Sequence, residues 1–184
     1  MSRGRQSLTP ALKCLTPDER GQLLNELLLA HPELVDDAEH RARTHLAVAD
    51  ADTVAALFQQ TLREADADQL TLRAGRVLGR GYVEVGEAAC EILEELLQSE
   101  LDDLARRAKL DLDDAAIQIG LGLLRGLAEC RTTIVDGTVL AYAGEDVTDG
   151  LAWSVFNAIA KAKLTLPGDA FDTLPKDWGR SLHP

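Results

Sequence analysis

Proline is absent between Pro32 and Pro167, although the chain of 184 residues contains six prolines. A proline inside a helix removes a hydrogen bond and clashes with the preceding turn, at a cost of about 3 kcal/mol. The same stretch is rich in Ala, Leu, Glu and Arg, and its apolar residues recur at helical spacing. The sequence therefore predicts an all-α fold of antiparallel helical hairpins, arranged either as a bundle or as a short α-solenoid-like stack.

The first clear helix start is at Thr16, which is followed by Pro17 and, three residues after Thr16, by Glu19. This is the pattern of a capping box with proline at the first helical position. We expect a helix from there to about Ala30 that packs a leucine face against the rest of the fold. The leucines expected to be buried are Leu23, Leu24, Leu27 and Leu28.

The longest amphipathic segment covers residues 84–110, where an aliphatic stripe lies opposite a run of glutamates. A second such segment covers residues 112–130, and Asp111 is expected to cap its N-terminus. The short connection predicts that the two helices form an antiparallel hairpin.

The region between these helices and the last helix gives a mixed signal. Asp136-Gly137 lies between two β-branched runs, so residues 132–142 form either a small β-hairpin or a loop.

In domain terms we expect a loose tail over residues 1–15, a helical domain over 16–166 and a C-terminal tail over 167–184. That last tail is expected to pack its large apolar side chains onto the domain; they are Phe171, Leu174 and Trp178.

Charge argues against nucleic acid as a ligand, because the formal net charge is −12 at pH 7. The basic clusters Arg76/Arg80 and Arg106/Arg107/Lys109 are short and lie beside acids. No apolar run is long enough to span a membrane, and no secretory signal follows the N-terminus. Three widely spaced cysteines indicate neither a disulfide framework nor a zinc clip, so we expect reduced thiols and a cytoplasmic location.

Two glycine patterns have a structural and a functional interpretation. Gly75, Gly79 and Gly81 match the spacing of a dinucleotide-binding loop, but the alternation of strands and helices that such a loop needs is missing, so a link between helices is favoured. Gly122 and Gly126 lie one helical turn apart, which favours close helix packing inside the fold over dimerisation in a membrane.

An acid and imidazole cluster lies at residues 36–45. A di-iron bundle requires paired Glu-x-x-His motifs, and none occurs in the chain, while zinc would require more His or Cys. A solvated helix face is the favoured interpretation of the cluster, whose members are Asp36, Asp37, Glu39, His40 and His45. We therefore predict no metal site and no cofactor.

The residues do not assemble a catalytic triad, and Cys90 lies in the apolar part of its helix, so no catalytic residue is assigned. The glutamate face of the longest helix is a candidate surface for a partner protein; it consists of Glu87, Glu91, Glu94 and Glu95. The alternative interpretation is that these glutamates form the ordinary solvated face of an amphipathic helix. A rival candidate is a ligand pocket between helices, lined by Arg125, Tyr142 and Trp153.

Two stretches resemble helical hairpins in bacterial proteins of unknown function, some of which adjoin SWIM-type zinc fingers. They are Gly81-Tyr-Val-Glu-Val-Gly-Glu-Ala-Ala-Cys-Glu-Ile-Leu-Glu-Glu-Leu-Leu and Asp113-Asp-Ala-Ala-Ile-Gln-Ile-Gly-Leu-Gly-Leu-Leu-Arg-Gly-Leu. The Cys-x-Cys and Cys-x-His ligands of such a finger are absent here. The resemblance thus implies an α-solenoid-like interaction region, without a zinc or nucleic-acid role.

Taken together, these features predict an acidic helical protein that binds another protein or its own copy without catalysis. The alternative is a small-molecule or metal-binding protein, an enzyme among the possibilities, with its site between helices.

Overall fold

The structure, a computed structural model, describes residues 9–77, 79, 81–132 and 136–180. Its contacts divide the chain into two compact units, Met1–Thr44 and His45–Pro184. The division falls inside α3 (Val35–Leu46) and therefore within residues 16–166, which the sequence analysis predicts to be one helical domain. Each unit is described by itself below.

The N-terminal unit is built from helices alone over its described residues. They are α1 (Pro10–Cys14), α2 (Pro17–Ala30), the 3-10 helix η1 (Pro32–Leu34) and most of α3. The expected capping box is confirmed at the start of α2: the backbone N–H of Glu19 donates to Thr16 Oγ1 over 3.3 Å, and the N–H of Thr16 donates to Glu19 Oε2 over 2.8 Å.

The expectation that the leucine face of α2 is buried is wrong. No described residue of the N-terminal unit is buried, and Leu24 and Leu27 leave 52% and 46% of their surface open. The reason is that periodicity predicts which face of a helix is apolar, whereas burial needs a second layer of side chains to cover that face.

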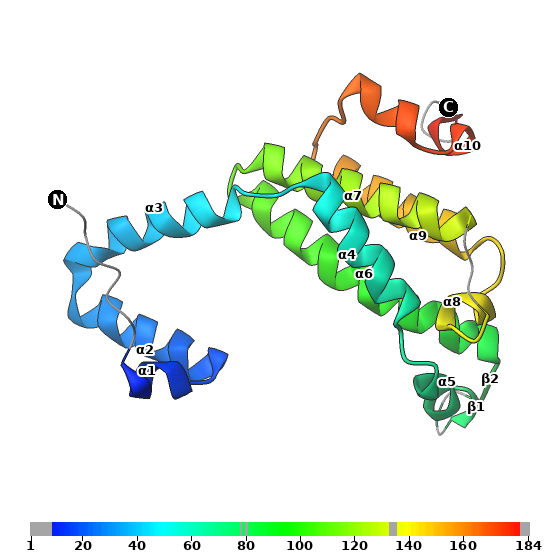
Figure 1. Cartoon of the computed structure of the whole chain (residues 1–184), viewed down its shortest axis with the longest axis horizontal. Coiled ribbons are helices and arrows are strands. Elements are labelled where there is room, and N and C mark those ends of the chain that lie inside the picture. The colour runs from blue at the N-terminus through cyan, green and yellow to red at the C-terminus, as the bar shows by residue number, and fades with distance from the viewer. Residues whose placement is uncertain (1–8, 78, 80, 133–135, 181–184) are drawn as a thin grey trace. The chain divides into compact units, whose positions relative to one another are not determined.

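The C-terminal unit is helical around a central α7 (Asp113–Thr132), which contacts α4, α6 and α9 (Figure 1). Its other elements are α4 (Ala51–Arg63), α5 (Asp68–Arg73), β1 (Gly75–Val77), β2 (Gly81–Val83), α6 (Val85–Lys109), α8 (Val139–Tyr142), α9 (Val147–Lys161), η2 (Gly168–Thr173) and α10 (Lys176–Arg180). The all-α fold with one small hairpin is thereby confirmed.

The hairpin lies in a different place from the one that the sequence suggests. β1 and β2 pair antiparallel, with Arg76 opposite Tyr82, and Gly79 and Gly81 supply the positive φ angles of 85° and 90° that the turn requires. In the 132–142 region, Thr132 ends α7 and residues 139–142 form α8, while residues 133–135 lie outside the described part. The glycine run that resembles a dinucleotide loop is thus the hairpin that links α5 to α6.

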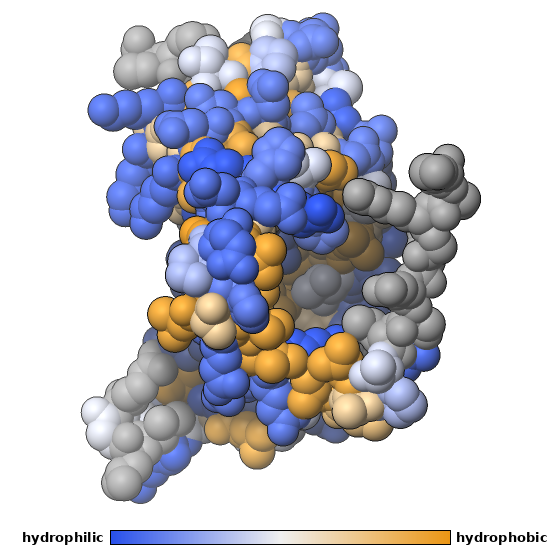
Figure 2. Space-filling view, turned by 90° about the vertical axis from the view of Figure 1, so that its left-hand side faces the viewer, coloured by the Kyte–Doolittle hydropathy of each residue, from blue (hydrophilic) through white to orange (hydrophobic). Residues whose placement is uncertain are grey.

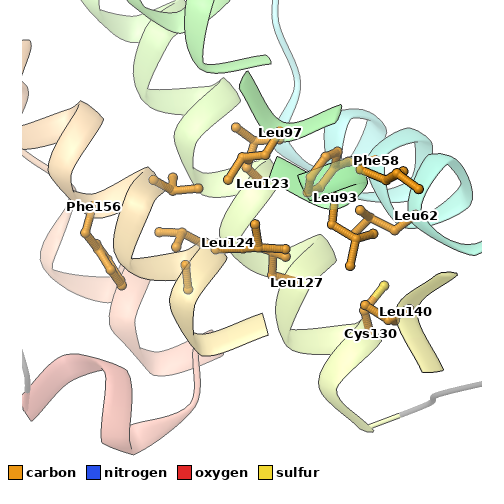
Figure 3. Packing of buried hydrophobic residues seen from close by; sticks show 14 of the residues in the cluster. Phe58, Leu62, Leu93, Leu97, Leu123, Leu124, Leu127, Cys130, Leu140 and Phe156 are labelled. Carbon is orange, nitrogen blue, oxygen red and sulfur yellow. The ribbon is translucent and has the colours of Figure 1, made fainter. Parts of the chain in front are cut away.

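Most of the core of the C-terminal unit is one hydrophobic cluster around α7, and a smaller second cluster consists of Ala51, Leu121 and Ala170. Figure 3 shows side chains converging there from α4, α6, α7, α8 and α9. The labelled members are Phe58, Leu62, Leu93, Leu97, Leu123, Leu124, Leu127, Cys130, Leu140 and Phe156.

Helix α4 packs against α7 at unusually short range. A Cβ atom built on Gly122 would lie 2.5 Å from the Cβ of Val54 and 2.7 Å from the carbonyl oxygen of Ala51. The N–H of Ala51 also donates to Gln118 Oε1 over 3.2 Å. The two-glycine face of α7 therefore serves close packing inside the fold, as the sequence predicts for residues 122 and 126.

The turn between α6 and α7 differs from the sequence prediction in the role of Asp111. The N–H of Leu112 donates to the carbonyl of Arg107 and the N–H of Asp111 donates to that of Ala108, both over 3.1 Å, which is a Schellman motif. Asp111 has a φ of 57° and takes the position usually filled by glycine. It therefore terminates α6, whereas the sequence assigned it as the cap of α7, which starts at Asp113.

Candidate functional site

On the glutamate face of α6, Glu95 forms a surface ion pair with Arg73. Arg73 on α5 holds Glu95 with two hydrogen bonds, Nη1 to Oε1 over 2.7 Å and Nη2 to Oε2 over 2.8 Å. These bonds lower the pKa of Glu95. Glu87 and Glu94 are exposed, and Glu91 is partly buried. One member of the proposed partner surface therefore ties α5 to α6.

The largest cavity that we describe lies between α4, α7 and the segment from η2 to α10, and its volume is about 820 Å³. Arg125 lines it, and its Nη1 donates to Asp52 Oδ1 over 2.7 Å. Glu129 and Asp172 line the same cavity. Because the lining contains three carboxylates and one guanidinium, whose Nη1 is already paired, the charge of this cavity does not favour an anionic ligand.

A second cavity, of about 210 Å³, contains both tryptophans of the chain. Trp178 is buried and donates from Nε1 to Asp149 Oδ1 over 2.8 Å, whereas Trp153 leaves 48% of its surface open. We call this site the tryptophan cavity; its lining consists of Asp149, Ala152, Trp153, Phe156, Asp177 and Trp178.

Arg131 of α7 connects the elements around the tryptophan cavity. Its Nη2 lies 2.7 Å from Asp177 Oδ2, its Nε lies 3.4 Å from Asp149 Oδ1, and its guanidinium carbon lies 6.0 Å from the ring centre of Trp178. The hydrogen bond to Asp177 raises the pKa of Arg131. The C-terminal segment also packs through Phe171, whose ring stacks on that of Phe156 at 6.5 Å between centres.

The three residues proposed to line one ligand pocket are not brought together. Arg125 lines the large cavity and Trp153 lines the tryptophan cavity. Tyr142 lies on α8, leaves 49% of its surface open and lines neither of the two. The sequence alone could not separate them, since only the packing decides which cavity each side chain meets.

The cysteines of the core are poor nucleophiles. Cys90 donates to the carbonyl oxygen of Ala143 over 3.5 Å, and burial raises the pKa of its thiol. Burial also raises the pKa of Cys130. A thiol must lose its proton to attack, so both are held in the unreactive form at neutral pH.

The acid and imidazole cluster lies on α3 as surface ion pairs. Asp37 pairs with Arg41 over 2.7 Å and Glu39 pairs with Arg43 over 2.8 Å. Within the described residues, no group of three His, Cys, Asp or Glu side chains is arranged to hold a metal ion.

In the basic cluster at residues 106–109, two of the three bases pair with a neighbouring acid. Arg106 and Arg107 both pair with Asp103. Arg80 lies outside the described residues. In the described part of the chain, none of the helices has the length and apolar character required to cross a membrane.

The exposed leucines of α2 are a feature that the sequence reading missed. The space-filling view shows hydrophobic side chains lying open among hydrophilic ones (Figure 2). On α2 the exposed large apolar residues are Leu24, Leu27 and Leu29. The available signal was the acidic, poorly apolar composition of α3, which offers little for a leucine face to pack against.

In comparisons with protein-family models, curated proteins and solved structures, no match to this chain was found. The resemblance to helical hairpins of bacterial proteins therefore stays a prediction.

Proposed function

We propose that this chain is a non-catalytic protein-interaction module that binds a partner protein through the leucine face of α2, defined as Leu23, Leu24, Leu27 and Leu28. The observation that carries the proposal is the exposure of Leu24 and Leu27 on a well-capped helix in a unit with no buried described residue. Two exposed leucines on one helix face, flanked by the partly exposed Leu23 and Leu28, are typical of a binding surface, and the third exposed leucine, Leu29, lies outside this face.

The geometry of α2 favours a helix-in-groove mode of binding. At about 100° per residue, the four leucines fall within about 140° of one another around the helix axis. Gln22 lies on the opposite side. Amphipathic helices of this kind insert their apolar face into a hydrophobic groove of a partner.

The charge of α2 indicates which kind of residue borders the partner's groove. Helix α2 carries the acids Asp18, Glu19 and Glu26 against the single base Arg20, and the whole chain carries a net charge of −12. A groove with basic residues along its rim would attract this helix, whereas a second copy of the same acidic helix would be repelled. The proposed partner is therefore a different protein with a basic-rimmed apolar groove.

Site-specific photo-crosslinking in cells tests the proposal. A photoreactive amino acid at position 24 should produce a discrete adduct, and the same group at position 22, on the opposite side of the helix, should not. The partner identified by mass spectrometry is then titrated with purified protein. The double variant Leu24→Ser/Leu27→Ser should weaken binding by tenfold or more, because centrally placed apolar anchors each contribute about 1–2 kcal/mol.

Glu94→Gln is the matched control for the rival surface on α6, and it should leave the affinity unchanged. Adducts of equal intensity from positions 22 and 24 would refute the proposal. So would an adduct whose mass shows only this chain, because the bound surface would then be intramolecular or a second copy.

A further inference from the structure

The tryptophan cavity combines aromatic rings and carboxylates in a space of about 210 Å³. We propose that it binds a small organic cation of the quaternary-ammonium class. The cavity lies entirely within His45–Pro184, so this inference does not depend on the leucine face of α2.

Two tryptophans and Phe156 are the aromatic component of the site. The face of an aromatic ring carries partial negative charge, and tryptophan is the strongest of the aromatic side chains in attracting cations. The structure already contains one such contact, since the guanidinium carbon of Arg131 lies 6.0 Å from the ring centre of Trp178. Trp153, half exposed on α9, is the ring that an arriving ligand can reach from solvent.

The charge of the lining favours a cation. Asp149 and Asp177 contribute two carboxylates to the lining, and Arg131, which pairs with both, is not itself a lining residue. The carboxylates are held in place by their partners: Asp149 accepts from Trp178 Nε1 over 2.8 Å, and Asp177 lies 2.7 Å from Arg131 Nη2. A pre-organised site of this kind loses less free energy on binding.

The hydrogen bonding selects the type of cation. A primary ammonium group brings three N–H donors that require acceptors, and a hard metal ion requires about six oxygen ligands. One oxygen of each carboxylate already accepts a hydrogen bond, Asp149 Oδ1 from Trp178 and Asp177 Oδ2 from Arg131, so fewer acceptors remain for such a ligand. A quaternary ammonium has no N–H group to satisfy, so it gains from the rings and the carboxylates without competing for acceptors.

The size of the cavity restricts the ligand further. Pockets for drug-sized molecules are about 300–1,000 Å³, and this one is smaller. It therefore suits a single trimethylammonium head, either of a free small molecule such as choline or of a trimethylated lysine side chain.

Intrinsic fluorescence provides a direct test, because the only two tryptophans of the chain both line the cavity. Choline titrated into the full-length protein to about 10 mM at constant ionic strength should change the emission along a saturable curve. The neutral carbon isostere 3,3-dimethylbutan-1-ol should leave the emission unchanged. Trp153→Leu should weaken binding by about fivefold, read from Trp178 emission and by calorimetry.

Tyr142→Leu is the matched control, because Tyr142 is a similarly exposed aromatic residue outside the cavity. The affinity of this variant protein for choline should equal that of the wild type. If Trp153→Leu fails to fold, as judged by circular dichroism, Trp153→Phe replaces it with a smaller expected weakening.

A linear or absent response to choline in the folded protein would overturn the inference. An equal response to the neutral isostere, or an affinity unaffected by the change at Trp153, would also overturn it. A parallel titration with a trimethyl-lysine peptide distinguishes the two sources of the ligand: tighter binding of the peptide indicates a protein-borne cation, and tighter binding of choline indicates a free one.

Discussion

The close contact between α4 and α7 predicts that adding a single methyl group at Gly122 lowers the stability of the fold. We expect Gly122→Ala to destabilise the protein, because the added Cβ would lie 2.5 Å from the Cβ of Val54 and 2.7 Å from the carbonyl oxygen of Ala51. Real Cβ atoms essentially never approach other heavy atoms more closely than 3.0 Å, and a backbone carbonyl cannot rotate out of the way. Helix α4 as a whole would have to move.

The magnitude follows from two opposing terms. Alanine is favoured over glycine inside a helix by about 1 kcal/mol. Overpacking a closely fitted contact costs about 1–3 kcal/mol, and the backbone atom in the contact places this site at the upper end of that range. The net loss should be about 2 kcal/mol, which in a chain of this size lowers the melting temperature by about 4–8 °C.

Two other glycines on helices make the comparison graded. At Gly126 a Cβ would lie 3.0 Å from the carbonyl oxygen of Ala55, so Gly126→Ala should be less damaging than Gly122→Ala. At Gly150 in α9 a Cβ would have no heavy atom within 4 Å, so Gly150→Ala should stabilise the protein by about 1 kcal/mol. Thermal and urea unfolding, followed by far-ultraviolet circular dichroism, provide the measurement. A Gly122→Ala variant as stable as the Gly150→Ala variant would refute the proposed packing of α4 on α7.

Three further substitutions test separate features by the same unfolding measurements. Thr148 is buried and its hydroxyl has no hydrogen-bond partner among the described residues, so Thr148→Val should stabilise the fold by about 1 kcal/mol; a loss would mean that the hydroxyl is satisfied. Asp111→Gly should stabilise by about 0.5–1 kcal/mol by relieving a φ of 57° at the end of α6, and no gain would argue against the left-handed conformation. Burial and the charge of Asp103 raise the pKa of Glu100 above its ordinary value, so folding favours the protonated form and stability falls as the pH rises from the ordinary to the raised pKa. Glu100→Gln should therefore be more stable than the wild type at pH 7 and equal to it at about pH 4, and a pH-independent difference would contradict this assignment.

Local signals in the sequence predicted helices well where a few neighbouring residues decide the outcome. The capping box at Thr16 is of this kind, because it depends on chemistry within one turn. The spacing of Gly122 and Gly126 indicated a face of α7 for close packing, but it did not identify α4 as the helix that packs there. The hairpin is the counterexample. Asp136-Gly137 carries the stronger turn signature, yet the strands pair around Gly79, where the three glycines permit the positive φ angles.

The candidate sites were less accessible to sequence reasoning. Trp153 lines a cavity without Arg125 or Tyr142, and its neighbours there include Asp149 and Trp178. That grouping comes from packing between α9 and the C-terminal segment, which no spacing rule reveals. Glu95 looked like part of a free acidic face until Arg73, 22 residues earlier, was found to hold it. Contacts between distant segments are decided by the whole fold.

The turn at Asp111 and the contact of Ala51 with Gln118 imply an order of assembly. Helices α6 and α7 are joined by a turn of three residues, so they can meet soon after they form, whereas bringing Ala51 to Gln118 closes a separation of 67 residues. Closing a long loop has a larger entropic cost and is slower than forming a local hairpin. We expect the glycine face of α7 to be covered late, so that the complete chain, when it refolds from denaturant, exposes this face until α4 packs on it.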